Sequence, residues 1–320
     1  MSIFKESEIN MTKQIKKIIY LCCVLLCIHS AFAKKPKVGI VVKSLNNEFF
    51  KEMQRGVEEY KHTHMDKVDI IFKGIPTETD HAGQIKIIEE FAKSKVDAII
   101  IAPVDSTKIV PIVLKLVKQN VIVINMDNKI DDRALAKYNI NIPFIGPSNF
   151  NGAKEVGSVL AQNKLKAGDK VAIIEGLSSS VNAKSRSDGY REAMREAKVS
   201  VERVKSADWE EAIAFDVATQ FLKEIENLKA ILCGNDSMAI GAIKAIEKMK
   251  MKDKVLVVGY DNIPSIKQYF KTNQLFATVD QFPSLQAITS IELALEALDK
   301  SMKQEELPNV LKTKTGVVLK

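Results

Sequence analysis

Cysteine is scarce in this sequence of 320 residues, and the positions of the cysteines exclude a fold that disulfide bonds hold together. Three of the four cysteines, Cys22, Cys23 and Cys27, lie in an apolar N-terminal stretch, so the rest of the chain keeps only Cys233. A single cysteine cannot form an internal disulfide, and the folded chain must therefore rest on its hydrophobic cores. With 46% hydrophobic and 27% charged residues, the composition is that of a globular protein long enough for two ordinary domains.

The N-terminal stretch itself has the pattern of a secretory signal peptide. Three lysines between positions 13 and 17 precede an apolar run at 18–28, and Ala31-Phe32-Ala33 offers a cleavage site between small residues. We expect residues 1–33 to be removed and the mature protein to be periplasmic. An uncleaved N-terminal anchor is the alternative.

A block of basic residues is also absent. The formal net charge of +7 falls to +5 once the four lysines and two glutamates of residues 1–33 are removed. This small positive net charge does not favour nucleic acid or anionic lipid as a partner, and we expect no nucleic-acid binding. Nor does the chain show a nucleophile elbow, paired catalytic carboxylates or metal-ligand spacing. His62 and His64 lie in a polar connector and are interpreted as solvated surface. We therefore expect no enzyme activity, no cofactor and no metal.

Apolar runs that read as strands alternate with amphipathic helical stretches along the rest of the chain. Most of the strand candidates are continuously apolar, which indicates parallel sheets covered by helices on both faces. The strand candidates are 37–42, 68–72, 97–102, 121–126, 170–174, 199–204, 230–233 and 254–259. The helical patterns are 49–61, 81–94, 107–119, 150–163, 185–197, 212–226 and 236–248. This alternation predicts a doubly wound α/β fold.

A faint internal repeat predicts two similar lobes. Residues 96–128 and residues 229–262 each read as a strand, a polar loop with Asp-Ser, a helix, a second strand and then Asp-Asn. Two open parallel sheets place a cleft between the lobes, with the carboxyl ends of the strands facing it.

Polar and aromatic residues collect directly after the strand candidates. A glycine-rich phosphate loop is missing after the first strand, where "KSLNNEFF" stands instead, so a phosphate ligand is not favoured. A neutral polyhydroxylated ring suits such a set, because aromatic rings stack on its C–H faces and planar polar groups bind its hydroxyls. Each residue alone also fits a core, cap, turn or surface role. The candidate ligand-binding residues are Lys43, Asn47, Phe49, Phe50, Asp127, Asn128, Lys184, Arg186, Trp209, Asn235, Tyr260, Asp261 and Gln281.

At these positions the chain resembles the periplasmic sugar-binding proteins of the ribose/allose group, over roughly residues 37–320. The motifs that carry the resemblance are "SLNNEFF", "APVDS", "INMDN", "AIIEG", "SADWEEAIAFDVAT", "CGNDSMAIGA", "VLVVGYDNIP" and "ATVDQFP". The resemblance implies the two-lobed fold that these proteins share with lactose-repressor-type regulators. It implies that the chain crosses between the lobes three times, near residues 144–148, 281–284 and 309–313. The lobes would comprise residues 34–146 plus 283–311 and residues 147–282 plus 312–320.

The resemblance also implies roles for single residues. Phe50 and Trp209 would stack on opposite faces of a sugar, and Asp127 would accept from two hydroxyls. Lys43 matches a lysine of allose-type proteins. Further contacts would come from Asn47, Phe49, Asn235, Asp261 and Gln281. Relatives carry an arginine in the loop at 178–188, and the choice between Lys184 and Arg186 stays open. Asn128 stands where relatives have Arg or Glu, which leaves the identity of the sugar open.

We therefore expect a monomeric solute-binding protein of an ABC-type importer. It would capture an allose- or ribose-like monosaccharide by closing its lobes about a hinge, and deliver it to a membrane permease. A sugar-sensing protein that feeds a chemotaxis receptor or a sensor kinase is one alternative, and a binder of another polyol such as inositol is a second. A transcription regulator of the same fold would need a helix-turn-helix where this chain has the signal pattern.

Overall fold

Two six-stranded sheets organise the protein in the computed structural model, which describes residues 35–252 and 254–320. Both sheets belong to the compact unit Pro36–Lys320. The expected signal peptide, residues 1–33, lies outside the described residues. In the part of the chain that the structure describes, no helix is long and apolar enough to cross a membrane.

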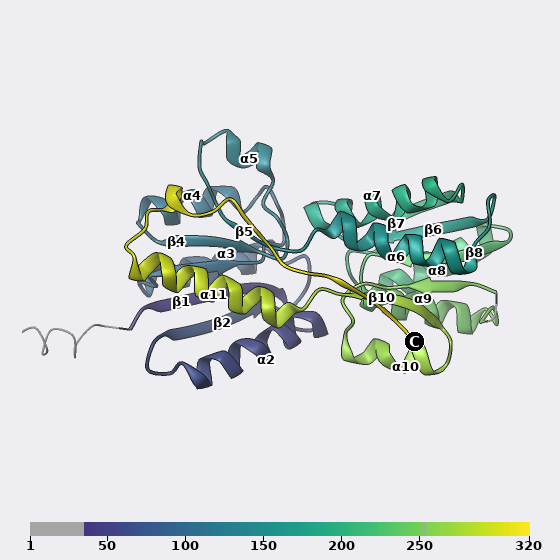
Figure 1. The fold of residues 1–320 in the computed structure, drawn as a ribbon, viewed down its shortest axis with the longest axis horizontal. Helices are drawn as coiled ribbons and strands as arrows, with labels where there is room; N and C mark the ends of the chain where they lie inside the picture. Colours follow the sequence, from purple (N-terminus) through teal and green to yellow (C-terminus); the bar gives the residue numbers. More distant parts are fainter. Residues whose placement is uncertain (1–34, 253) are drawn as a thin grey trace, which may run out of the picture. The chain divides into compact units, whose positions relative to one another are not determined.

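The first sheet, with its helices, forms what we call the N-lobe. Its strand order is β11-β5-β4-β3-β1-β2, and every neighbouring pair is parallel. The strands are β1 (Lys37–Ser44), β2 (Asp69–Ile75), β3 (Ala98–Ile101), β4 (Ile122–Met126), β5 (Phe144–Gly146) and β11 (Val310–Lys312). Its helical elements are α2 (Glu48–Thr63), α3 (His81–Lys93), α4 (Val110–Lys118), α5 (Asp132–Ala136), α11 (Pro283–Asp299) and η2 (Gln304–Glu306). Helix α11 comes from late in the chain and packs beside α2 and against β4 (Figure 1).

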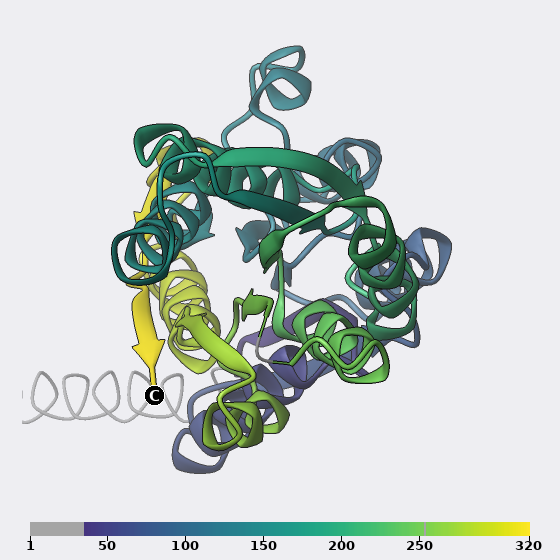
Figure 2. The same cartoon turned by 90° about the vertical axis from the view of Figure 1, so that its right-hand side faces the viewer.

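The second sheet, with its helices, forms the C-lobe. Its order is β12-β10-β9-β8-β6-β7, and all pairs are parallel except β12, which runs antiparallel to β10. The strands are β6 (Lys170–Glu175), β7 (Ser200–Ser206), β8 (Leu228–Cys233), β9 (Leu256–Val258), β10 (Leu275–Asp280) and β12 (Gly316–Leu319). The helical elements are α6 (Asn149–Lys164), α7 (Val181–Glu196), α8 (Glu211–Glu224), α9 (Asp236–Lys248), η1 (Pro264–Ile266) and α10 (Lys267–Lys271). Figure 2 shows these helices on both sides of the C-lobe strands.

The predicted fold class, two similar doubly wound parallel-sheet lobes, is confirmed. Every predicted strand and helix is present, with ends that differ by a few residues. The largest difference is at α7, which begins at Val181 rather than 185. The strand and helix patterns had left out β5, β10, β11, β12, α5, α10 and α11. Several of these are elements of three to five residues, too short to show a period.

Continuous apolar strands produce the cores of both lobes. All four residues of β3 are fully buried, because helices cover both faces of the sheet at this central strand. Burying each isoleucine of β3 contributes roughly 1.5–3 kcal/mol relative to leaving it exposed. Strand β7, at the edge of its sheet, instead has no fully buried residue.

The chain passes between the two sheets three times. It leaves the first sheet after β5, at residues 147–148, and leaves the second after β10, at residues 281–282. It crosses again between β11 and β12, at residues 313–315. By sheet membership Lys312 belongs to the N-lobe. In both lobes, polar loops and the first residues of helices follow the carboxyl ends of the parallel strands.

Candidate functional site

Ten of the thirteen predicted site residues line one cavity. Its N-lobe wall consists of Lys43, Asn47, Phe49, Phe50 and Asp127, and its C-lobe wall consists of Asn182, Arg186, Trp209, Asn235, Asp261 and Gln281. The volume of this cavity is only about 10 Å³. The side chains thus nearly fill the cavity, and a molecule larger than water needs the walls to move apart.

Asn47 is fixed by two bonds at the junction of β1 and α2. Its Oδ1 accepts from the Phe49 N–H at 3.0 Å and so caps the helix, and its Nδ2 donates to Glu78 Oε1 at 2.9 Å. This leaves the amide one further N–H. The adjacent Phe49 and Phe50 rings meet edge to face, with centroids 5.0 Å apart, and both are buried.

Lys43 places an ammonium between aromatic rings of the two walls. Its Nζ lies 5.5 Å from the centroid of Phe50 and 5.1 Å from that of Trp209. The residue is only 4% exposed, so its charge needs a partner, and the Glu78 carboxylate lies 3.6 Å away. Burial raises the pKa of Glu78, while Lys43 and the Asn47 bond oppose the rise.

Asp127 offers a carboxylate oxygen that no protein group binds. The residue follows β4 in the left-handed region, with φ of 62°, and its N–H donates to the Ile145 carbonyl. Its Oδ2 is buried without a hydrogen-bond partner. Burial raises the pKa of Asp127, and the charges of Lys43 and Arg186 counteract this.

Arg186 is the most firmly held side chain of the C-lobe wall. Its Nε donates to Asn149 Oδ1 at 2.7 Å, and its Nη1 donates to the Gly234 carbonyl at 2.7 Å. The same Nη1 lies 3.4 Å from Asp261 Oδ1, and the guanidinium lies 3.8 Å from the centroid of the Tyr260 ring. These contacts leave Nη2 for another partner.

Asp261 and Gln281 form a second polar unit of this wall. Gln281 Nε2 donates to Asp261 Oδ1 at 2.6 Å, while Gln281 Oε1 is buried without a partner. Burial raises the pKa of Asp261 to about 7, although Arg186 opposes the rise.

Trp209, the single tryptophan of the chain, is buried with its Nε1 unpartnered. Its ring lies against the end of β6 at Gly176, where a Cβ would come within 2.1 Å of the indole. Only glycine therefore leaves room for the indole at this point. Asn235 caps α9 through its Oδ1 and donates to the Trp209 carbonyl at 3.4 Å.

Three predicted residues do not line the cavity. Of the pair that the sequence left open, Arg186 lines the cavity, whereas the Lys184 side chain is 76% exposed and pairs with Asp188 at 2.7 Å. Asn128 is buried next to the cavity, where its Nδ2 donates to the Pro103 carbonyl at 2.8 Å. Tyr260 lies behind Arg186, as the ring that supports the guanidinium.

The sequence reasoning missed Asn182, Glu78 and Asn149. Asn182 lies one helical turn before Arg186 on α7, and its Oδ1 is buried without a partner. Glu78 stands in the loop after β2, and its signal in the sequence is therefore that of a polar residue that follows a strand. Asn149 opens α6 and has no signal of its own in the sequence.

Direct hydrogen bonds join the lobes beside the cavity. The Ser106 N–H donates to the Ser179 carbonyl at 3.0 Å, and the Val181 N–H donates to Ser106 Oγ at 3.1 Å. Asn128 Oδ1 accepts from the Asn182 N–H at 3.3 Å. At another point of the junction, Glu48 Oε2 accepts from the Ser265 N–H at 2.9 Å.

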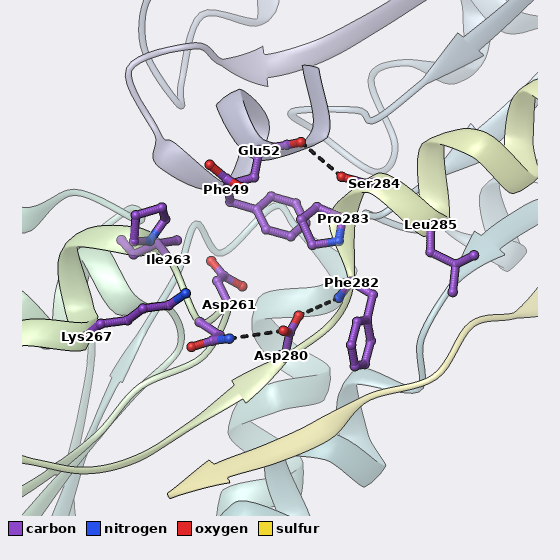
Figure 3. A pocket seen from close by; sticks show the side chains of 12 residues that line it. Phe49, Glu52, Asp261, Ile263, Lys267, Asp280, Phe282, Pro283, Ser284 and Leu285 are labelled. Atoms are coloured by element: carbon purple, nitrogen blue, oxygen red, sulfur yellow. Dashed lines mark hydrogen bonds between the residues drawn. The ribbon is translucent and has the colours of Figure 1, made fainter. Parts of the chain in front are cut away.

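A larger groove adjoins the cavity, and Phe49 and Asp261 line both (Figure 3). The volume of this groove is about 340 Å³. Its polar groups largely bond to one another: Asn262 Nδ2 donates to Asp280 Oδ2 at 3.0 Å, and Asp280 Oδ1 accepts from the Phe282 N–H at 2.7 Å. We take the smaller cavity as the candidate site, because four of its lining residues have a buried polar atom without a partner, whereas the groove has one, Asn262 Oδ1.

Comparison with known proteins was consistent across sequence and structure. A model described as "periplasmic binding protein domain" matches residues 38–302. The chain is 41% identical to the D-ribose/D-allose-binding protein of Pseudomonas aeruginosa over 294 residues, 92% of either chain. An ABC transporter solute-binding protein from Burkholderia multivorans superimposes with a TM-score of 0.87 at 46% identity, over 89% of this chain and 100% of that one. One from Actinobacillus succinogenes, with bound D-allose, has a TM-score of 0.80 at 32% identity, over 89% and 97%.

Proposed function

The chain belongs to the periplasmic binding protein family, and on this premise we propose that it captures a neutral monosaccharide of the allose or ribose type. The site would be the cavity between the N-lobe and the C-lobe. Similar proteins that are named for ribose and allose binding support the choice of ligand class.

The observation that carries the proposal is the pairing of two aromatic rings with unpartnered polar atoms of both kinds. Phe50 and Trp209 face the cavity from opposite lobes. The unpartnered acceptors are Asp127 Oδ2, Asn182 Oδ1 and Gln281 Oε1, and the unpartnered donor of the C-lobe wall is Trp209 Nε1. A sugar hydroxyl both donates and accepts, so a polyol satisfies such a mixture, whereas each atom left unpaired costs about 1–3 kcal/mol.

Binding would proceed by opening and closing of the lobes. The small free volume of the cavity requires the walls to separate before a sugar enters. Hinge movement would act at the three crossings, which supports the expected lobe boundaries near residues 146, 282 and 311. The bonds of Ser106 and Asn128 across the junction would add to the closed form, and a sugar that bridges both walls would shift the equilibrium towards it.

The captured sugar would be delivered to the permease of an ABC importer in the periplasm. We propose import rather than sensing because similar solved proteins are named as ABC transporter components. The protein would act as a monomer that carries a solute and catalyses no reaction.

Calorimetric titration of the mature protein tests this proposal. The panel would comprise aldoses, ketoses, inositols, nucleosides, amino acids and inorganic anions. We expect saturable binding of one or a few neutral aldoses, with D-allose and D-ribose as the first candidates. Binding of an amino acid or an anion, with no binding of any polyol, would overturn the proposal.

A further inference from the structure

Glu78 is a buried carboxylate that adjoins the cavity without lining it. The residue is 2% exposed and lies in the loop between β2 and α3, behind Lys43 and Asn47. Asn47 Nδ2 donates to its Oε1 at 2.9 Å, and Lys43 Nζ lies 3.6 Å from its Oε2. Both carboxylate oxygens thus face donors, the arrangement that suits an ionised carboxylate.

The side chains that line the cavity carry equal numbers of positive and negative charges, and Glu78 adds one further carboxylate beside them. Lys43 and Arg186 supply two cations to the lining, and Asp127 and Asp261 supply two carboxylates. Arg186 is matched within the C-lobe wall, where it reaches Asp261 at 3.4 Å. Lys43 has its ion pair with Glu78 instead, and Asp127 Oδ2 remains unpartnered.

We propose that Glu78 is a specificity-determining residue that makes the site accept neutral sugars and reject their acids. This inference rests on the proposed function and adds the class of sugar that the site excludes. With Glu78 in place, the ammonium of Lys43 is neutralised from behind, and the cavity carries one more carboxylate than cation. An incoming carboxylate then meets no uncompensated cation, and like charges in contact are strongly unfavourable.

Glu78 also sets the direction of hydrogen bonding on the N-lobe wall. It takes one N–H of the Asn47 amide while the helix cap takes one lone pair of the Asn47 oxygen, so the second N–H of Asn47 is left to donate to a ligand. Its Oε2 has no hydrogen-bond partner, so it can receive the Lys43 ammonium when that group gives up the space between Phe50 and Trp209. Glu78 would act through these two side chains, as a positioning residue without contact to the sugar.

The test compares neutral sugars with their uronic acids by calorimetric titration. D-allose serves as the neutral probe, and D-alluronate keeps its pyranose ring but ends in a carboxylate. Wild-type protein should bind the acid at least ~10-fold more weakly than its parent sugar. Equal affinities would overturn the inference without the need for any variant.

Glu78→Gln then isolates the charge, because the amide oxygen of glutamine still accepts from Asn47. We expect the ratio of neutral to acid affinity to fall at least ~10-fold, since Lys43 becomes an unpaired cation that a carboxylate can reach. Glu78→Asp keeps the charge and should keep the ratio within about 3-fold. Glu90→Gln removes the partner of Lys73 on the surface of the same lobe and is the matched control.

The double variant Lys43→Met/Glu78→Gln restores the wild-type charge of the cavity. It should bind sugars more weakly but return the ratio of neutral to acid affinity to within about 3-fold of wild type. Equal weakening of both ligand classes by Glu78→Gln would show a structural role alone and would overturn the inference. Failure of the wild type to bind any neutral sugar would instead overturn the proposed function.

Discussion

The two walls of the cavity hold their cations in different ways. In the C-lobe, Arg186 is fixed by Asn149, the Gly234 carbonyl and Asp261, and it lies on the ring of Tyr260. In the N-lobe, Lys43 has a single carboxylate at 3.6 Å and otherwise lies between aromatic rings. A rigid fork with several bonds is preorganised, whereas an ammonium on a flexible stem can move as a ligand enters.

This difference indicates that the two walls have different roles in the proposed sugar site. The C-lobe wall offers polar atoms in set positions, so it would select the pattern of hydroxyls. The N-lobe wall offers the Phe49 and Phe50 rings and the Lys43 ammonium on its flexible stem, so it would supply contact area and adjust to closure. Variants of the two walls should therefore differ in how they affect affinity and stability.

The largest effect is expected from Arg186→Ala. The change removes a buried guanidinium and leaves Asp261 without its cation, which should weaken sugar binding by about 3–5 kcal/mol. Lys184→Ala is the matched control, because this lysine is exposed on the same helix and should leave affinity unchanged. Calorimetric titration measures both, and a larger loss from Lys184→Ala than from Arg186→Ala would contradict the assignment.

Asp127→Ala should separate binding from stability. Its Oδ2 has no partner within the protein, so in the proposed site the carboxylate would serve the ligand rather than the fold. We expect affinity to fall by about 2 kcal/mol, the size of a hydrogen bond to a charged group, with little change in the free energy of unfolding. Unchanged affinity, measured by titration beside a chemical denaturation curve, would remove Asp127 from the site.

Asp261 should make the stability of the sugar-free protein depend on pH. Its pKa of about 7 in the folded protein lies above that of an unfolded aspartate, so the folded state binds the proton more tightly. Stability from this group is therefore present below about pH 4 and is lost as pH rises towards 7.

The comparison with Asp261→Asn isolates this contribution. Between pH 4 and 7, the free energy of unfolding of the wild type should fall by at least ~1.4 kcal/mol relative to that of the variant, which corresponds to one pKa unit. Denaturation curves at several pH values measure the difference. A difference that stays constant, or that moves in favour of wild type as pH rises, would contradict the raised pKa.

Substitution of Trp209 should have the smallest effect on affinity, and the fluorescence of its indole should report the entry of a ligand. Because it is the single tryptophan, all tryptophan emission comes from this side chain, and a sugar that stacks on it should change that emission. Trp209→Phe keeps a smaller ring and should cost about 0.5–1.5 kcal/mol of affinity. Emission that stays the same at saturating sugar would show that the indole does not contact it.

The sequence predicted the sheets and most of the cavity because two simple rules operate at each strand. Continuous apolar runs such as β3 indicate strands buried on both faces, and the residues after them lie at one edge of the sheet. Lys43, Asn47 and Asp127 were found in this way. The rule gives the place of a residue in the chain but not the direction of its side chain, which explains the exceptions.

Two exceptions show what decides that direction. At Asp127 the backbone enters the left-handed region, and the following Asn128 turns to bond the Pro103 carbonyl. On α7 the predicted start at 185 hid the relation between Asn182 and Arg186, which lie one turn apart on the side of the helix that faces the cavity. Lys184 lies on another side of that helix. A helix start at Val181 would have placed Asn182 and Arg186 on one side of the helix, and Lys184 on another.

A crystal structure of the protein grown with the neutral aldose that binds most tightly tests the central claim most directly. We predict a sugar ring between Phe50 and Trp209, with hydroxyls within hydrogen-bond distance of Asp127 Oδ2 and Arg186 Nη2. Lys43 Nζ should have moved from between the rings towards Glu78. A sugar bound in the groove beside Ser284 and Lys267, or a cavity that keeps Lys43 between the rings at saturating sugar, would contradict the account.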